Sequence, residues 1–337
     1  MLIDFSQSSI ESLVPKTDFQ RSVITFLEEW YSPFATVKVQ TSGSTGMPKT
    51  LCVEKEKMKH SAKVTCDFLG LQEDDLALLC LPVEYISGKM MIVRAIMRKM
   101  KLCVVSPSLT PLENLQQKID FCAMTPLQAE KSFSKIHDIK KLIIGGAQVS
   151  EGLKKKISSL SIRVYETYGM TETLSHIALK LLAPKTEDYF CVLDDITVSQ
   201  DKRGCLEICA PHLHHEIIQT HDRVELRDEK SFRFLGREDN VINSGGIKIF
   251  PEELEAIAKK EITEEVVFLG LKDKFLGEKL VLVVEGQKTR DVCDKIGALS
   301  FSKKYHVPKE IFFLKKIPRT PNGKIDRKEL RSVVEEK

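Results

Sequence analysis

A run of hydroxyl and glycine residues that ends in a lysine occupies residues 41–50, with the sequence TSGSTGMPKT. Glycines let a backbone approach a ligand closely, and the hydroxyls and the lysine can donate hydrogen bonds to phosphate oxygens. A polar surface turn has a similar composition. A P-loop does not fit, because Pro48 stands where that motif needs glycine, and proline has no N–H to donate. The candidate phosphate ligands are Thr41, Ser42, Gly43, Ser44, Thr45, Gly46 and Lys49.

Residue types that suit nucleotide chemistry recur later in the chain. The ring of Tyr168 offers a face for adenine, and Glu172 has the carboxylate oxygens that Mg²⁺ prefers. Asp222 can accept hydrogen bonds from both hydroxyls of a ribose. Lys324 can neutralise charge that develops at a phosphate. Taken one at a time, a packed core tyrosine, a solvated surface acid and a surface lysine are the plain alternatives for Tyr168, Glu172 and Lys324.

In their order along the chain, these segments resemble the motifs of the adenylate-forming superfamily, which includes acyl-CoA synthetases, nonribosomal adenylation domains and luciferases. The matching segments are TSGSTGMPK, GGA at 145–147, YETYGMTET at 165–173, THD at 220–222, GREDNVINSGGIKIFPEELE at 236–255 and PRTPNGKIDR at 318–327. The resemblance runs from about Thr36 to Arg327. It implies activation of a carboxylic acid by ATP and Mg²⁺ as an acyl-adenylate, followed by transfer to coenzyme A.

The resemblance also implies roles for individual residues. Lys324, Thr171 and Glu172 would be catalytic, with Glu172 holding the magnesium ion and Asp239 acting as a hinge. The nucleotide and the coenzyme would be bound by the phosphate loop and by Gly146, Ala147, Tyr168, Asp222, Arg237, Gly245 and Gly246. The acyl group would contact Tyr85, Gly145, Thr167, Ser175, His176 and Lys180.

Three features depart from the family pattern. His221 stands at the variable middle position of the Thr-x-Asp motif, and Glu84-Tyr85 replaces an aromatic–His pair that many members carry. The phosphate loop also begins close to the N-terminus, so we expect a shortened first subdomain. A shortened subdomain would leave part of a sheet uncovered. A second copy of the chain could cover it, so a homo-oligomer is one alternative.

Within the superfamily the sequence is most similar to the o-succinylbenzoate–CoA ligases of menaquinone biosynthesis. The similarity rests on Ile86-Ser-Gly88, on Ser244-Gly-Gly246 with Pro251-Glu-Glu, and on the hydroxyl–His pair at 175–176. A second carboxylate in the substrate needs cationic or hydroxyl partners. Helical spacing would place His176 and Lys180 on one face, with Lys89 and Arg94 as further candidates. Another acyl- or aryl-CoA synthetase, or an adenylation enzyme that loads a carrier protein, is the alternative.

The elements that must position these residues follow from the apolar pattern. Short apolar runs alternate with amphipathic stretches, which predicts an α/β sheet with parallel strands. We expect strands at 76–81, 102–105, 121–124, 142–144 and 162–165, and helices at 89–100 and 151–159. Residues 191–234 read as a β-rich subdomain. The fold predicted is a large N-terminal AMP-binding α/β domain at 1–236 and a small, mobile C-terminal α+β domain at 237–337.

Composition narrows the class of partner. The 51 basic and 48 acidic residues give a net charge of +3, which favours neither nucleic acid nor a membrane surface. The nine cysteines contain no C-x-x-C pair, and the N-terminus lacks a signal-peptide pattern, so we expect a cytoplasmic protein. Cys205, Cys209, His212, His214 and His215 form a cluster of possible metal ligands. Cys205 and Cys209, however, lie four apart in a strand pattern, about 13 Å from each other at ~3.3 Å per residue, which is too far to share one zinc ion, so we do not expect zinc there.

Overall fold

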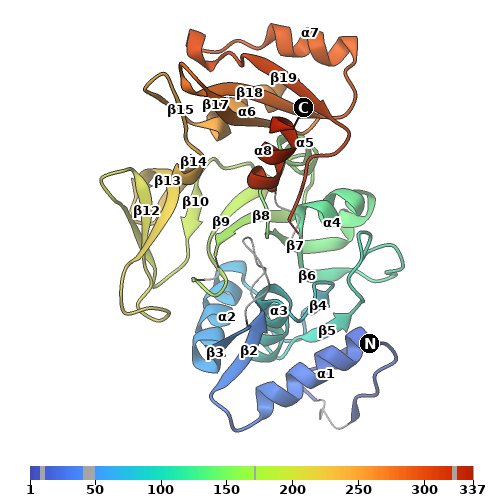
Figure 1. Ribbon diagram of the computed structural model, residues 1–337. Coiled ribbons are helices and arrows are strands. Elements are labelled where there is room, and N and C mark those ends of the chain that lie inside the picture. Colours follow the sequence, from blue (N-terminus) through green and yellow to red (C-terminus); the bar gives the residue numbers. More distant parts are fainter. Residues whose placement is uncertain (8–11, 41–49, 171, 321–324, 337) are drawn as a thin grey trace. The chain divides into compact units, whose positions relative to one another are not determined.

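The computed structural model (Figure 1) describes residues 1–7, 12–40, 50–170, 172–320 and 325–336. The chain forms two compact units. The first contains Met1–Val149, Leu153–Val198 and Ile208–Ile218, and the second contains Ser150–Gly152, Ser199–Glu207 and Gln219–Lys337.

The first unit is a mixed α/β structure. Its helices are α1 (Asp18–Tyr31), α2 (Lys55–Leu69), α3 (Ile86–Met97), α4 (Pro126–Lys131), the 3₁₀ helix η2 (Phe133–Asp138) and most of α5 (Glu151–Ile157). Its strands are β1 (Leu2–Asp4), β2 (Thr36–Gln40), β3 (Thr50–Glu54), β4 (Leu76–Leu79), β5 (Lys101–Val104), β6 (Ile119–Met124), β7 (Ile139–Ile144), β8 (Arg163–Gly169), β9 (His176–Ala183) and β10 (Phe190–Val192).

The sheet of this unit has the strand order β1-β5-β4-β6-β7-β8-β9-β10. The five strands from β5 to β8 are parallel, as the alternation of apolar runs predicts, and each predicted run coincides with one of them. Strands β1, β9 and β10 are antiparallel to their neighbours. Because parallel strands tend to be buried on both faces, they contain continuous apolar runs, such as Leu76–Leu79 in β4 and residues 142–144 in β7. Leu78, Cys122, Leu142, Ile144 and Val164 join one core with α4 and α5.

Helices α2 and α3 pack side by side in the first unit (Figure 1). Helix α2 ends at Gly70, whose φ of 60° is the left-handed conformation that glycine adopts most easily at a helix end. Near the start of α3, a Cβ on Gly88 would lie 2.2 Å from the carbonyl oxygen of Pro82, so only glycine fits there. This contact fixes the start of α3 and thereby the position of Arg94 near its end.

The second unit begins with β-hairpins and continues as an α+β structure. Strands β11 (Thr197–Gln200) and β12 (Cys205–Cys209) join the units along the chain, and β13 (Ile218–Asp228) follows. Its later elements are β14 (Ser231–Arg237), η3 (Glu238–Asn240), β15 (Ile242–Ser244), β16 (Ile247–Ile249), α6 (Pro251–Glu261), β17 (Val266–Asp273), β18 (Gly277–Glu285), α7 (Arg290–Ala298), η4 (Lys304–His306), β19 (Glu310–Leu314) and α8 (Arg327–Glu335).

A five-stranded sheet with two cores organises the end of this unit. Successive residues of β17 point to opposite faces. Val266 and Phe268 join a core with α6 and α7, whereas Val267, Leu269 and Leu271 join a core with α8 on the other face. The predicted α/β architecture with a β-rich segment and a small α+β part is thus confirmed.

One local expectation is wrong. His176 and Lys180 do not share a helix, because residues 176–183 form strand β9, which pairs antiparallel with β8. Apolar residues occupy both faces of this segment, which suits a strand that is covered on both sides. Burial of these residues and pairing with β8 outweigh the helical spacing of His176 and Lys180. The expected strand at Cys205–Cys209 is present, and all nine cysteines are free thiols. Among the described helices, none combines the length and apolarity needed to cross a bilayer.

Candidate active site

Two predicted pocket segments meet where β7 and β8 end. Gly145 follows β7, and a Cβ there would lie 2.2 Å from the Oγ1 of Thr167 on β8. Gly146 has a φ of 85°, a conformation that favours glycine. The GGA turn therefore packs against the second pocket segment. Tyr168, on the same strand, contacts Phe190 with ring centroids 5.9 Å apart.

Several predicted residues lie outside the described part of the chain. They are the phosphate-loop residues Thr41, Ser42, Gly43, Ser44, Thr45, Gly46 and Lys49, together with Thr171 and Lys324. Glu172 is described and exposed, and its backbone oxygen lies 2.6 Å from the Nε2 of His214, which donates to it. Tyr85 is partly buried at the start of α3, where residues 40 and 85 form an isolated parallel bridge.

A buried turn precedes β9 and presents Ser175. Thr173 is fully buried, and its Oγ1 accepts a hydrogen bond of 2.9 Å from the Met170 N–H. Leu174 has a φ of 64°, a left-handed conformation that is strained for a residue with a side chain. The strained turn places the Ser175 hydroxyl 2.9 Å from an Nη2 donor of Arg94 on α3.

Arg94 is a buried cation that has no acidic partner in the part of the chain that the structure describes. Its side chain is among the largest fully buried ones, at 2% exposure. Burial lowers the pKa of its guanidinium to about 10, so the group stays protonated at neutral pH. Among the described residues no carboxylate pairs with it, and its Nε has no hydrogen-bond partner. An unpaired buried charge is costly, and an anionic ligand is the ordinary way to compensate it.

His176 lies next to this cation as a neutral ring. Burial, and secondly the charge of Arg94, hold the pKa of His176 well below its usual value. Its Nε2 is 3.0 Å from the Oγ1 of Thr65, whose single proton points to the Ser61 carbonyl oxygen at 3.0 Å. From this network we assign the His176 proton to Nε2. Thr65 could not be identified from the sequence, because its contact with His176 depends on the packing of α2 against β9.

Lys180 has a different environment from the one predicted. Its Nζ is 2.8 Å from the Oε2 of Glu166, directly across the β8–β9 pair, and lies 4.4 Å from the Phe190 ring centroid. The Lys154 Nζ is 3.9 Å from the same oxygen, and the Val149 N–H donates to Oε1 at 3.0 Å. Lys180 is therefore already paired with an acid, whereas no acid among the described residues pairs with Arg94.

In the second unit, two separate motifs meet across a strand pair. Asp222 on β13 and Arg237 on β14 are register partners, and Nη1 of Arg237 donates to Oδ1 of Asp222 at 2.9 Å. Nη2 of Arg237 also bonds Asp239, which His221 Nδ1 approaches within 3.1 Å. The buried Asp222 carboxylate is thus held in place by a cation.

Gly245 and Gly246 form the two-residue turn between β15 and β16. Their φ angles are 60° and 79°. Both values are positive, as the tightest hairpin turns require, and glycine is favoured at both positions. The hairpin itself is therefore a sufficient structural reason for the two glycines.

Known proteins resemble this chain in both sequence and structure. The sequence model of the family described as "AMP-binding enzyme" matches residues 37–195. The solved structure of an acyl-CoA synthetase (AMP-forming)/AMP-acid ligase II-like protein from Dyadobacter fermentans is 33% identical, with a TM-score of 0.67, and the match covers 99% of each chain. The chain belongs to the AMP-binding enzyme family. The family and fold predicted from the motifs are confirmed.

More distant members of the family are also similar. A 2-succinylbenzoate–CoA ligase from Listeria monocytogenes is 26% identical over 94% of this chain and 73% of that protein. The structure of o-succinylbenzoate coenzyme A synthetase from Bacillus subtilis, in complex with ATP and magnesium ion, has a TM-score of 0.72 at 20% identity, over 87% of this chain and 69% of that one. At 20% identity, the similarity to the Bacillus subtilis structure shows a shared fold.

Proposed function

We propose that this AMP-binding enzyme is an o-succinylbenzoate–CoA ligase of menaquinone biosynthesis. In the first step the succinyl carboxylate attacks the α-phosphorus of ATP and pyrophosphate leaves, which gives an acyl-adenylate. In the second step the thiol of coenzyme A attacks the acyl carbon and AMP leaves. The curated relatives named 2-succinylbenzoate–CoA ligase support this substrate.

The buried Arg94 is the observation that carries the substrate class. The cation lies beside the Ser175 hydroxyl and the neutral His176, and the described residues supply no acid to neutralise it. A carboxylate bound there would accept charge-assisted hydrogen bonds from the guanidinium. We assign the ring carboxylate of o-succinylbenzoate to Arg94 and Ser175. A fatty acid would leave the cation without a partner.

The remaining predicted residues fit the first step of this reaction. We propose that Tyr168 stacks on adenine and that Asp222, held by Arg237, accepts the ribose hydroxyls. Glu172 would hold Mg²⁺, which shields the phosphate charges when it is bound. Lys324 would stabilise the charge that develops when the carboxylate attacks.

The second step would require a rotation of the C-terminal part about Asp239. Lys324 and the Gly245–Gly246 turn serve different half-reactions at one nucleotide, so a hinge must exchange them. Asp239→Pro fixes φ and should leave adenylation intact while thioester formation fails. A variant with both half-reactions at the wild-type rate would remove the hinge from the mechanism.

A panel of carboxylic acids tests the proposed function. The purified protein is incubated with ATP, Mg²⁺, coenzyme A and each of o-succinylbenzoate, benzoate, octanoate and acetate, and AMP release is followed. We expect the highest kcat/KM for o-succinylbenzoate. A higher value for any monoacid would reject this substrate, and AMP release only with a carrier protein would reject coenzyme A as the acceptor.

Lys324→Ala serves as the catalytic control. Loss of one transition-state donor should slow acyl-adenylate formation by about 10²–10³-fold. It should spare thioester formation from acyl-adenylate supplied in advance. An equal loss in both half-reactions would contradict the role of Lys324.

A further inference from the structure

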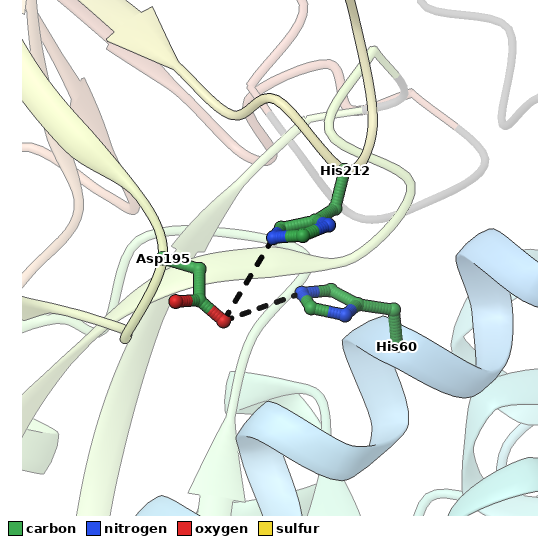
Figure 2. Close-up of side chains that lie close together, drawn as sticks. All are labelled: His60, Asp195 and His212. Carbon is green, nitrogen blue, oxygen red and sulfur yellow. Dashed lines mark ion pairs between the residues drawn. The ribbon is translucent and has the colours of Figure 1, made fainter.

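Three side chains that have no role in the proposed reaction converge at the surface of the first unit. They are His60 on α2, Asp195 after β10 and His212 after β12 (Figure 2). Their ligand atoms all lie within 4.8 Å of one another. These three residues are called the HDH cluster below. They come from segments far apart in the sequence, so the fold and not local spacing brings them together.

The geometry of the HDH cluster leaves space between its polar atoms. Both Nε2 atoms face the same oxygen, Asp195 Oδ2, at 3.8 Å for His60 and 3.9 Å for His212 (Figure 2). These distances are too long for hydrogen bonds. They are only slightly longer than the ~3.4 Å between ligand atoms of a tetrahedral zinc ion with bonds of about 2.1 Å. Small side-chain rotations would therefore suffice to coordinate one ion.

The chemistry of the donors selects a class of metal. The two imidazole rings are stacked, with centroids 4.0 Å apart. Two cationic rings would repel each other at this distance, so the stacked pair favours neutral imidazole. Neutral imidazole with one carboxylate suits zinc, cobalt or nickel, whereas Mg²⁺ and Ca²⁺ prefer oxygen ligands.

The surrounding structure holds the ligands in place. Asp195 adopts a φ of 63°, a left-handed conformation that aspartate tolerates better than most residues. His212 lies in a tight turn in which the N–H groups of Leu213 and His214 donate to the Ala210 carbonyl at 2.8 and 2.9 Å. The three ligands also line a pocket whose other walls are largely apolar, including Val64 and Leu213, and His176 lines the same pocket.

We propose that His60, Asp195 and His212 form a binding site for a divalent transition-metal ion of the zinc class, with water completing the coordination. The ion would join α2 to the two loops that carry Asp195 and His212. The same turn carries His214, whose Nε2 donates to the Glu172 backbone oxygen at 2.6 Å. Metal binding would therefore stiffen the segment that bears the proposed magnesium ligand, without entering the reaction.

Titration of the metal-free protein with Co²⁺ tests this site. We expect one Co²⁺ per chain with visible absorption bands of nitrogen and oxygen ligands and no thiolate charge-transfer band. The last criterion excludes the exposed thiols of Cys52, Cys191 and Cys209. Zn²⁺ should displace the cobalt, and the metal should raise the melting temperature because it binds the folded state.

Single-ligand variants decide the assignment. His60→Ala, His212→Ala and the nearly isosteric Asp195→Asn should each weaken Co²⁺ binding by at least about 10-fold, the smallest loss seen even for outer-shell partners. His215→Ala, which removes an exposed histidine of the same loop, is the matched control and should bind like wild type. No binding by the wild type, unchanged binding in the three variants, or a thiolate band would each overturn the proposal.

Discussion

Glu166 and Arg94 are both buried charges of the first unit, but their surroundings differ. Glu166 has Lys180 at 2.8 Å, Lys154 at 3.9 Å and a backbone donor. Arg94 has one neutral hydroxyl partner and an Nε without any partner in the described chain. A compensated buried charge is part of the scaffold, whereas an uncompensated one costs stability and is retained for a ligand. The contrast shows Lys180 paired within the fold, and it supports our proposal that Arg94 binds the substrate.

The largest effect on stability is expected for Lys180→Met. The change leaves the buried carboxylate with the more distant Lys154 and the Val149 N–H, and breaking such a buried ion pair costs about 3 kcal/mol or more. The free energy of unfolding, measured in urea, should fall accordingly. Lys140→Met, which removes a largely exposed partner of Asp120, is the matched control and should cost less than about 1 kcal/mol. Equal losses of stability in the two variants would contradict the claim that the buried Lys180–Glu166 pair contributes more than the more exposed Lys140–Asp120 pair.

The Lys180–Glu166 ion pair should also make the free energy of unfolding depend on pH. Burial raises the pKa of Glu166, but the charges of Lys154 and Lys180 and the hydrogen bonds outweigh it, so the folded pKa lies below the ordinary value of 4.5. A lowered pKa contributes stability above the unfolded value and loses it as pH falls through the folded value. The stability difference between wild type and Lys180→Met should therefore be largest at neutral pH and shrink in acid. A difference independent of pH would contradict the ion-pair account.

A smaller change in stability is expected for Arg94→Met. Removal of an uncompensated buried cation relieves its desolvation cost, and methionine fills a similar space. The free energy of unfolding without substrate should stay within about 1 kcal/mol of wild type or rise. A loss as large as that of Lys180→Met would mean that Arg94 is also structural.

The smallest effect is expected for the titration of His176. Burial and Arg94 keep its pKa well below 6.5, so the ring stays neutral over the range in which an ordinary histidine titrates. The His176 ring signals in NMR should not shift between about pH 6 and pH 8. In Arg94→Met one of the two causes is gone, and the pKa should move upward. A wild-type His176 that titrates near 6.5 would contradict the buried network.

The sequence predicted the parallel strands well, because strands buried on both faces leave continuous apolar runs. The individual motifs were also visible, yet their contacts were not. That Asp222 and Arg237 face each other depends on the register of β13 and β14, and that Lys180 meets Glu166 depends on β8 and β9. Burial of Arg94 depends on the packing of α2 and α3. Such long-range packing leaves no local pattern, and for the same reason the HDH cluster could not be predicted.

The most direct test compares o-succinylbenzoate with 4-oxo-4-phenylbutanoate, which has the same reacting carboxylate but lacks the ring carboxylate. Both acids are assayed with wild type and with Arg94→Met, and kcat/KM is measured for each pair. Loss of a buried charged partner costs about 2–5 kcal/mol, so wild type should prefer the diacid by at least about 30-fold. Arg94→Met should lose this preference by reacting poorly with the diacid while retaining its activity on the monoacid. The same preference in both proteins would show that Arg94 does not bind the second carboxylate.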